Sequence, residues 1–445
     1  MKEIIGTQKK GAQRPALRTV CAAVAAVVCG LAAGVAQAQA QLDVPDQDWT
    51  PNAEADVIKL MGRVGVTHDS NVLRLNNQSQ AGIYSNKKAG DTALNGAMGI
   101  QFDRLISQQR LRANAEVEGF KYKEYSDFDH VGYNVGTTLD WVVGRPLFGR
   151  AGLRLDRKQP TVQDRVYNQT TNVSGDRNNI DTQNLFFNAG FRFTPAWSVI
   201  GGVDYTRSRN TLEVYKDTDY DLTGAEGGVR YAPGTGIEVD LVYRAVDGKY
   251  KSAQRYDDNG AALLCNNNNC RKNDYNEDSL QARIQYRPSE DSSLGGFVGY
   301  TRRDYDQGNR NFRGLTAGFD TEWALSGAVQ MRASLGRSIE PDDDAVTNSY
   351  ADTWSLNFSP TIQATGKISI DPFLRLYDRR YKGDQLTVGQ IERKDKIYML
   401  GVEANYEFRR NLFLMANLSH ERRDSNRNNL DYTANVFGVG LKVQF

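Results

Sequence analysis

Apolar and polar side chains alternate at every second residue along many segments of this chain. One segment places on a single face Val131, Tyr133, Val135, Thr137, Leu139, Trp141 and Val143. Two others do the same with Leu185, Phe187, Ala189, Phe191 and Phe193, and with Ile237, Val239, Leu241, Tyr243 and Ala245. A helix would repeat its apolar residues every three or four positions, so this period of two predicts β-strands with one apolar and one polar face.

About eighteen such segments fill the chain, each of roughly ten to fifteen residues, which is the length that a tilted strand needs to cross a bilayer. They begin near residues 56, 93, 109, 130, 147, 183, 197, 219, 236, 278, 293, 312, 328, 351, 368, 395, 411 and 431. Mean hydropathy of −0.58 fits this reading, because only alternate residues of such a strand face lipid. The sequence predicts an all-β protein, a transmembrane antiparallel up-and-down β-barrel of about 18 strands, with 16 to 18 as the range.

The connections between these segments alternate in length. Short ones lie around residues 107–109, 144–146, 194–196, 232–235, 287–290, 325–327 and 409–411, and most of the connections between them are long and polar, including 68–92, 158–182, 248–277, 339–350 and 380–394. Barrels of the outer membrane have short periplasmic turns and longer outer loops. We therefore expect every long connection on the outer side and both ends of the barrel in the periplasm.

The first forty residues are expected to be a signal peptide rather than part of the fold. Basic residues precede an apolar run from Val20 to Ala36, and cleavage is expected after Ala38 or Ala40. A membrane anchor is the alternative, but the run is barely long enough to span a bilayer and ends at the cleavage signal. Residues 41–55 are expected to form a periplasmic lead-in and 56–445 the barrel.

Removing residues 1–40 also changes the charge of the chain. The segment carries five basic residues and one acidic residue, so the formal net charge falls from +1 to −3. Binding to nucleic acid relies on a basic surface, so we do not expect nucleic acid as a partner.

Two cysteines remain in the mature chain, Cys265 and Cys270, with four asparagines between them. Export places them in an oxidising compartment, and we expect a disulfide that pinches a loop tip. A metal site is the alternative, but two thiols without a nearby histidine supply only half of the usual ligands. We predict no metal and no cofactor.

The last segment ends with an aromatic residue at the carboxyl terminus. One face of the segment carries Phe437, Val439, Leu441, Val443 and Phe445. A final strand of this kind resembles the assembly signal that the barrel-assembly machinery of bacteria reads. The segment must also pair with the first strand, because an open sheet edge cannot lie in lipid.

The polar face of the segments carries charges of both signs. The candidates for the lumen are Arg112, Glu116, Glu118, Arg154, Asp156, Arg192, Asp204, Glu238, Asp240, Arg283, Arg332 and Arg375. They form either a network of internal ion pairs that narrows the bore or the wall of a hydrated channel for a polar solute, and the two interpretations are compatible.

A hydrolase is a further alternative that the histidines raise. His68, His130 and His420 lie near the outer ends of predicted strands, and His68 precedes Asp69 and Ser70. Neighbours along a strand point to opposite faces, so this adjacency argues against a catalytic pair, and no catalytic residue is predicted. The acidic run from Glu340 to Asp344 is interpreted as a solvated loop, with Ca²⁺ binding as the alternative.

The stretch from Gly65 to Leu75 contains Asp69, Asn71, Val72, Leu73 and Arg74. This Asp-x-Asn-apolar-apolar-Arg element at the end of the first strand resembles the EpsL-like outer-membrane β-barrels associated with exosortase-linked exopolysaccharide operons. The resemblance implies a non-enzymatic channel or accessory protein of the outer membrane that serves biosynthesis or export of extracellular polysaccharide.

The partners that this interpretation implies are outer-membrane lipid and lipopolysaccharide, the barrel-assembly machinery, the exopolysaccharide and periplasmic export components. A general or substrate-specific porin for small polar solutes is the alternative function.

Overall fold

The structure is a computed structural model that describes residues 57–74, 76, 88–159, 178–253, 272–289, 291–307, 311–341, 350–382, 392–427 and 430–445. The expected signal peptide and lead-in, Cys265 and Cys270, and the acidic residues after Pro341 lie outside the described residues.

The described chain is almost entirely β-strand. Its strands are β1 Val57–Asp69, β2 Asp91–Ile106, β3 Gln109–Tyr122, β4 His130–Val143, β5 Leu147–Lys158, β6 Ile180–Arg192, β7 Trp197–Asn210, β8 Tyr220–Tyr231, β9 Ile237–Tyr250, β10 Tyr275–Ser289, β11 Ser292–Tyr305, β12 Phe312–Ser326, β13 Val329–Pro341, β14 Tyr350–Phe358, β15 Thr361–Thr365, β16 Ile368–Lys382, β17 Lys394–Arg409, β18 Leu412–Ser425 and β19 Tyr432–Gln444. Two short 3₁₀ helices, η1 Ser126–Phe128 and η3 Glu213–Thr218, lie in connections. None of the helices in the described part of the chain is long and apolar enough to cross a membrane.

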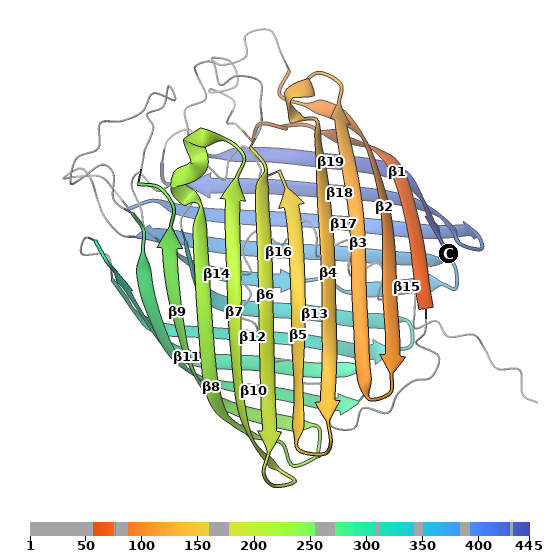
Figure 1. The fold of residues 1–445 in the computed structure, drawn as a ribbon. Coiled ribbons are helices and arrows are strands. Elements are labelled where there is room, and N and C mark those ends of the chain that lie inside the picture. Colours follow the sequence, from red (N-terminus) through yellow and green to blue (C-terminus); the bar gives the residue numbers. More distant parts are fainter. Residues whose placement is uncertain are drawn as a thin grey trace, which may run out of the picture. The chain divides into compact units, whose positions relative to one another are not determined.

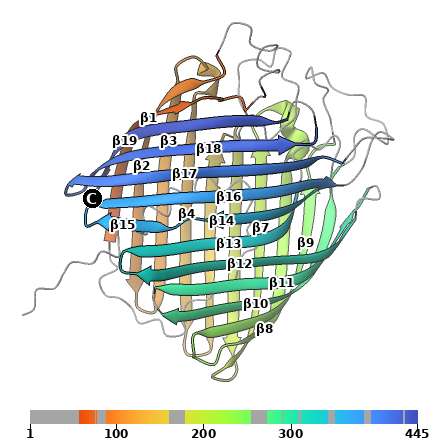
Figure 2. The same ribbon diagram turned by 180° about the vertical axis from the view of Figure 1, so that it is seen from behind.

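The sheet closes on itself (Figures 1 and 2). Apart from β14 and β15, each strand pairs antiparallel with the strands before and after it in sequence, and β1 pairs with both β2 and β19. The seam between first and last strands runs from Met61 opposite Gln444 to Asp69 opposite Val436, and Leu60 and Phe445 exchange two backbone hydrogen bonds of 2.9 Å. The predicted barrel is therefore confirmed, and the described strands leave no free sheet edge.

The described strands fill eighteen positions although there are nineteen of them, because β14 and β15 share one position. Both pair with β13 on one side and with β16 on the other. The interruption falls at Ser359 and Pro360, where proline has no backbone N–H to donate to a neighbouring strand. The pairing stays in register across the gap, because Phe358 lies opposite Leu374 and Ile362 opposite Ile370.

Short and long connections lie at opposite ends of the barrel. One end, here called the turn rim, carries the connections of two to five residues such as 107–108, 144–146 and 232–236. The other end, the loop rim, carries the connections between β1 and β2, β5 and β6, and β9 and β10. Figure 1 shows the short turns from β2 to β3 and from β4 to β5 at the same end of these strands. This is the alternation that the sequence predicts.

Candidate functional site

The outward face of the barrel carries the exposed apolar side chains. On β7, Trp197, Val199 and Val203 are each between 43% and 55% exposed, and they alternate with the buried Ser198 and Ile200. The same pattern recurs around the barrel, for example at Leu94, Met98, Val117, Val131, Leu185, Leu241, Leu280, Val298, Leu315, Leu335, Leu400, Leu418, Phe437, Val439 and Leu441. An apolar surface that encircles the molecule is suited to lipid and not to water.

Large aromatic side chains bound this apolar belt at both ends. Near the turn rim, Trp197 and Tyr231 lie side by side with ring centroids 4.9 Å apart. Toward the loop rim, the exposed rings are Tyr300, Trp354 and Tyr398. Aromatic girdles of this kind mark the two interfaces of a membrane, where a ring can keep its body in apolar surroundings and its polar edge in water.

The inward face holds the charged residues that were predicted to line the lumen, and the structure places them in two different environments. On β7 to β10 they are buried in mutual ion pairs. On β1 to β5 and on β12 and β13 they stay partly accessible. The two parts of the lumen are here called the sealed wall and the open wall.

The sealed wall is a closed network of carboxylates and guanidinium groups. Arg230 lies between Glu238, at 2.8 Å, and Asp240, at 2.6 Å. Next to this triad, Arg244 contacts Asp204 at 2.7 Å. All of these side chains are at most 14% exposed.

Glu226 extends the sealed wall from β8 to β10. Its carboxylate lies 3.6 Å from Arg244 and 3.0 Å from Arg283, and Arg283 also donates to the side-chain oxygen of Gln281. Removing one member of such a buried network would leave an uncompensated charge, so the network holds its strands in one arrangement.

The open wall contains ion pairs that water can reach. Arg63 on β1 extends over β2 and pairs with both Glu116 and Glu118 of β3, each at 2.8 Å, and the three side chains are between 23% and 35% exposed. On the same wall, Arg112 contacts Asp140 at 2.5 Å and is 41% exposed.

The charges of β12 and β13 are also partly accessible to water. Arg332 lies 3.0 Å from Glu322, and these side chains are 31% and 44% exposed. A hydrated channel requires paired charges that water can reach. Water and the opposite charge of each pair together offset the free energy of placing an ion inside the barrel.

Four of the predicted lumen residues have no ion pair within the described chain: Arg154, Asp156, Arg192 and Arg375. Two of these guanidinium groups lie over aromatic rings instead, Arg192 over Phe148 at 5.5 Å and Arg375 over Phe373 at 4.9 Å. Such a contact offsets part of the desolvation of the cation while leaving its N–H donors available.

Neutral amides accompany the charges of the open wall. Asn114 donates to Asn134 at 2.9 Å, and Asn134 donates to Asp156 at 3.1 Å, so that one polar ladder crosses β3, β4 and β5. Outside the open wall, a further contact between β6 and β7 joins Asn184 to Thr206 at 2.9 Å. The residues predicted to line the lumen are all charged and do not include these amides, although Asn114 and Asn134 alternate with outward apolar residues in the same way as Arg112 and could be predicted from that pattern.

Aromatic rings on the inward face lie against glycines of the neighbouring strands. A Cβ on Gly152 would lie 2.5 Å from the ring of Phe186, and a Cβ on Gly318 would lie 2.5 Å from that of Phe297. Only glycine leaves room for a ring this close to the backbone of the wall.

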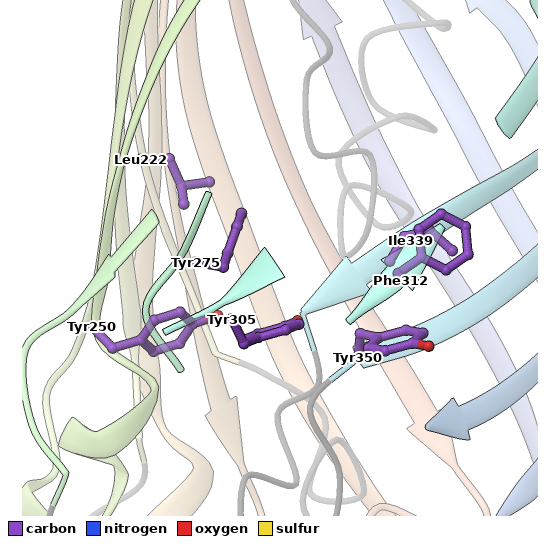
Figure 3. Close-up of a cluster of buried hydrophobic side chains, with 7 residues drawn as sticks. All are labelled: Leu222, Tyr250, Tyr275, Tyr305, Phe312, Ile339 and Tyr350. Carbon is purple, nitrogen blue, oxygen red and sulfur yellow. The ribbon is translucent and has the colours of Figure 1, made fainter. Parts of the chain in front are cut away.

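At the loop rim, seven successive strands from β8 to β14 each contribute one residue to a continuous buried row (Figure 3). Its members are Leu222, Tyr250, Tyr275, Tyr305, Phe312, Ile339 and Tyr350. The guanidinium group of Arg303 lies 4.3 Å from the Tyr275 ring centroid and pairs with Glu277 at 2.6 Å. This row, here called the aromatic row, joins the loop ends of these strands.

The motif residues Asp69, Asn71 and Arg74 form a clasp over the seam at the loop rim. Arg74 is 8% exposed and contacts the carboxylate of Asp69 at 2.6 Å and that of Glu421, on β18, at 3.1 Å. Asn71 accepts a backbone hydrogen bond from Arg74 and donates its amide to the Thr433 carbonyl on β19 at 3.0 Å. The motif thus ties the first strand to the last two.

Burial alone would lower the pKa of Arg74, but the carboxylates of Glu421 and Asp69 outweigh it and raise that pKa above its usual value. Arg74 also adopts φ +51°, and the preceding residue, Leu73, is buried in a cluster with Tyr125 and Phe128. The side chain of Arg74 therefore stays charged although it is buried, and its backbone has a conformation that few residues other than glycine adopt.

The three histidines lie near the loop rim and do not come together with partners for catalysis. His68 contacts Thr92 at 3.0 Å, and His420 contacts Asn435 at 2.8 Å, both at exposed positions. The ring of His130 stacks on Phe120 and contacts the carbonyl of Phe128. Within the described ranges, no cluster of three or more His, Cys, Asp or Glu side chains is arranged to hold a metal ion.

The final strand shows the pairing that barrel closure requires. Phe437, Val439, Leu441 and Phe445 are exposed on the outward face, while the strand pairs with β18 and β1. Its role as a signal for the assembly machinery stays a prediction.

Comparison with known proteins gives one family and several solved structures. Residues 294–445 match the family described as "Putative beta-barrel porin 2". No curated protein matches the chain. The family match and the closed barrel together point to a porin-like barrel of the outer membrane.

The similar solved structures are bacterial proteins at low sequence identity. The outer membrane protein OpdK of Pseudomonas aeruginosa is 10% identical, with 87% of this chain and 99% of that chain covered and a TM-score of 0.44. OpdL of the same organism is 13% identical, with coverage of 87% and 98% and a TM-score of 0.42. The ferric enterobactin receptor PfeA, also from P. aeruginosa, is 8% identical, with coverage of 87% and 80% and a TM-score of 0.41.

Proposed function

We propose that this protein is a non-enzymatic channel of the outer membrane, with its turn rim toward the periplasm and its loop rim outside. The observation that carries the proposal is the opposite chemistry of the two faces of one closed sheet. Apolar side chains encircle the outside, while the open wall inside keeps paired charges accessible to water. A closed cylinder of this kind separates lipid from a polar lumen.

We propose further that its cargo is extracellular polysaccharide, which it helps to export. The EpsL-like motif supports this, and so does the chemistry of the open wall. Amides such as Asn114 and Asn134 can exchange hydrogen bonds with hydroxyl groups, and the inward rings Phe186 and Phe297 offer flat apolar faces. The partners on this proposal are lipopolysaccharide, the barrel-assembly machinery and periplasmic export components.

The second candidate is a porin that takes up small polar solutes. The match to a family described as porins favours it, and so does the even mixture of charge signs along the open wall. Neither candidate requires a catalytic residue.

Deletion of the gene separates the two candidates. We expect the deletion strain to lose polysaccharide from the cell surface and to regain it when the intact protein is supplied. A deletion strain with normal surface polysaccharide and impaired uptake of a small solute would assign the porin function instead.

Histidine variants provide the control for the hydrolase alternative. Replacement of His68 and His420 by Ala should restore polysaccharide as well as the intact protein does. Loss of a hydrolytic activity in that variant would contradict a non-enzymatic channel.

A further inference from the structure

Three cationic side chains converge on one carboxylate at the loop rim. Asp221 of β8 accepts from Arg209 at 2.6 Å, from Lys251 at 2.8 Å and from Arg207 at 3.3 Å. The hydroxyl of Tyr205 donates to the same carboxylate at 3.0 Å. These contacts come from two neighbouring strands, β7 and β8, and from the residue that follows β9, and they hold the cations together in a group that we call the cationic cluster.

The cationic cluster lies on the outward face of the barrel, not in the lumen. Arg207 and Arg209 continue the parity of Val203, which is 55% exposed on the apolar belt. On β8, Asp221 has the parity of the exposed Val229. The cluster therefore lies directly above the apolar belt, at the end of the strands where the loops begin.

The charges of the cluster do not balance. Three cations share one carboxylate, which leaves a surplus of two positive charges, and Arg207 and Lys251 are 43% and 54% exposed. Two other outward pairs at the same rim match one cation to one acid, Arg422 with Asp424 and Arg380 with Asp378.

The neighbours that face the cluster do not remove this surplus. On β6, Asp181 is engaged by Arg157 at 2.6 Å in a bidentate pair. On the other side, Lys249 contacts Asp247 at 3.2 Å and Asp306 at 3.5 Å, so this group carries one negative charge in excess and lowers the surplus from two positive charges to one.

We propose that the cationic cluster binds the phosphate group of a lipid headgroup in the outer leaflet. The position above the apolar belt places the cluster in the headgroup layer, and this step rests on the proposed membrane location. Guanidinium and ammonium groups are the side chains that recognise phosphate, through charge-assisted hydrogen bonds. Asp221 already holds the three cationic side chains close together, so the site is preorganised for the lipid phosphate.

Arg207 and Lys251 are the residues to change, because Arg209 also donates to the backbone carbonyls of Ser208 and Tyr220 and so supports the strand ends. The test variant is Arg207→Gln with Lys251→Gln. The matched control is Arg302→Gln with Arg422→Gln, which removes the same charge from outward positions that are 52% and 59% exposed.

Binding is measured on the full-length mature protein in nanodiscs of phosphatidylcholine, titrated with diphosphorylated lipid A, with dephosphorylated lipid A, or with inorganic phosphate. We expect the test variant to bind diphosphorylated lipid A about ten- to thirtyfold more weakly than the parent, since each cation near an anionic headgroup contributes about 1 kcal/mol. The control should bind as the parent does, and dephosphorylated lipid A should not distinguish the three proteins.

Equal weakening in the test variant and the control would overturn the proposal, because net charge and not this site would then explain the effect. An unchanged affinity in the test variant would also overturn it, and so would inorganic phosphate that competes at micromolar concentration, which would identify a site for free phosphate. Failure of the parent to enter nanodiscs would instead refute the proposed membrane location, so the two failures are distinguishable.

Discussion

At the residue scale, the clasp at the seam shows what a short motif does in this fold. Asp69, Asn71 and Arg74 are close in sequence, but Glu421 and Thr433, which they contact, are about 350 residues away. The motif could be recognised from the sequence, whereas its role could not. The pairing depends on closure of the barrel, which places β1 beside β19 and one strand away from β18.

Replacement of Arg74 by Ala should destabilise the barrel by about 3 kcal/mol, because it leaves the carboxylates of Asp69 and Glu421 without their shared cation. Urea unfolding of the refolded protein in micelles measures this. The exposed pair of Arg422 and Asp424 supplies the control, and Arg422→Ala should cost less than about 1 kcal/mol. Similar losses in the two variants would show that the clasp contributes no more than a surface ion pair.

A glycine under an aromatic ring gives the second prediction. A Cβ on Gly401 would lie 2.4 Å from the ring of Phe373, whereas one on Gly227 would have nothing within 4 Å. Gly401→Ala should therefore lower stability by about 1–3 kcal/mol, while Gly227→Ala should be nearly neutral or stabilising. The same unfolding measurement tests both, and a neutral Gly401→Ala would mean that the ring moves aside freely.

At the element scale, the alternation of side chains predicted the strands because it is a local property. Each predicted start lies within a few residues of an observed one, from β1 to β19. The extra strand β15 could not be predicted from alternation, because Pro360 interrupts the pairing without changing the register. The aromatic row was also missed, since its seven residues come from seven strands and share no motif.

The aromatic row should stabilise the loop ends of its strands. Tyr305 lies at its centre, with ring contacts to Tyr275 at 5.6 Å and to Tyr350 at 6.4 Å. We expect Tyr305→Ala to cost about 3–5 kcal/mol by unfolding in micelles. Tyr300 lies on the same strand but is exposed on the outward face, and Tyr300→Ala should cost clearly less. An equal cost for both variants would contradict a packed row.

At the scale of the whole molecule, the lumen divides into a sealed and an open wall. The parity of the strands predicted which charges face inward, but it could not predict which of them pair. Pairing depends on neighbours such as Arg63, which crosses β2 to contact Glu116 and Glu118. Permeating ions should therefore encounter charged side chains along the open wall.

Replacement of Glu116 and Glu118 by Gln should make the channel more selective for anions, because Arg63 loses both of its counter-charges. Reversal potentials in planar bilayers under a salt gradient measure this, and we expect a shift of about 10 mV or more. The matched control replaces the outward acids Asp378 and Asp424 by Asn, which should leave the reversal potential unchanged. An equal shift in the control would assign selectivity to the loop rim and not to the lumen.

The alternation of lipid-facing and water-facing residues is tested most directly by thiol labelling of the protein in intact outer membranes. Asn114→Cys and Val117→Cys lie on the same strand and face opposite sides, and both positions are exposed in the bare protein. In a background with Cys265 and Cys270 replaced by Ser, a membrane-impermeant maleimide should label position 114 and leave position 117 unlabelled until the protein is extracted and unfolded. Equal labelling of both positions in the intact membrane would contradict the barrel as a seal between lipid and a water-filled lumen.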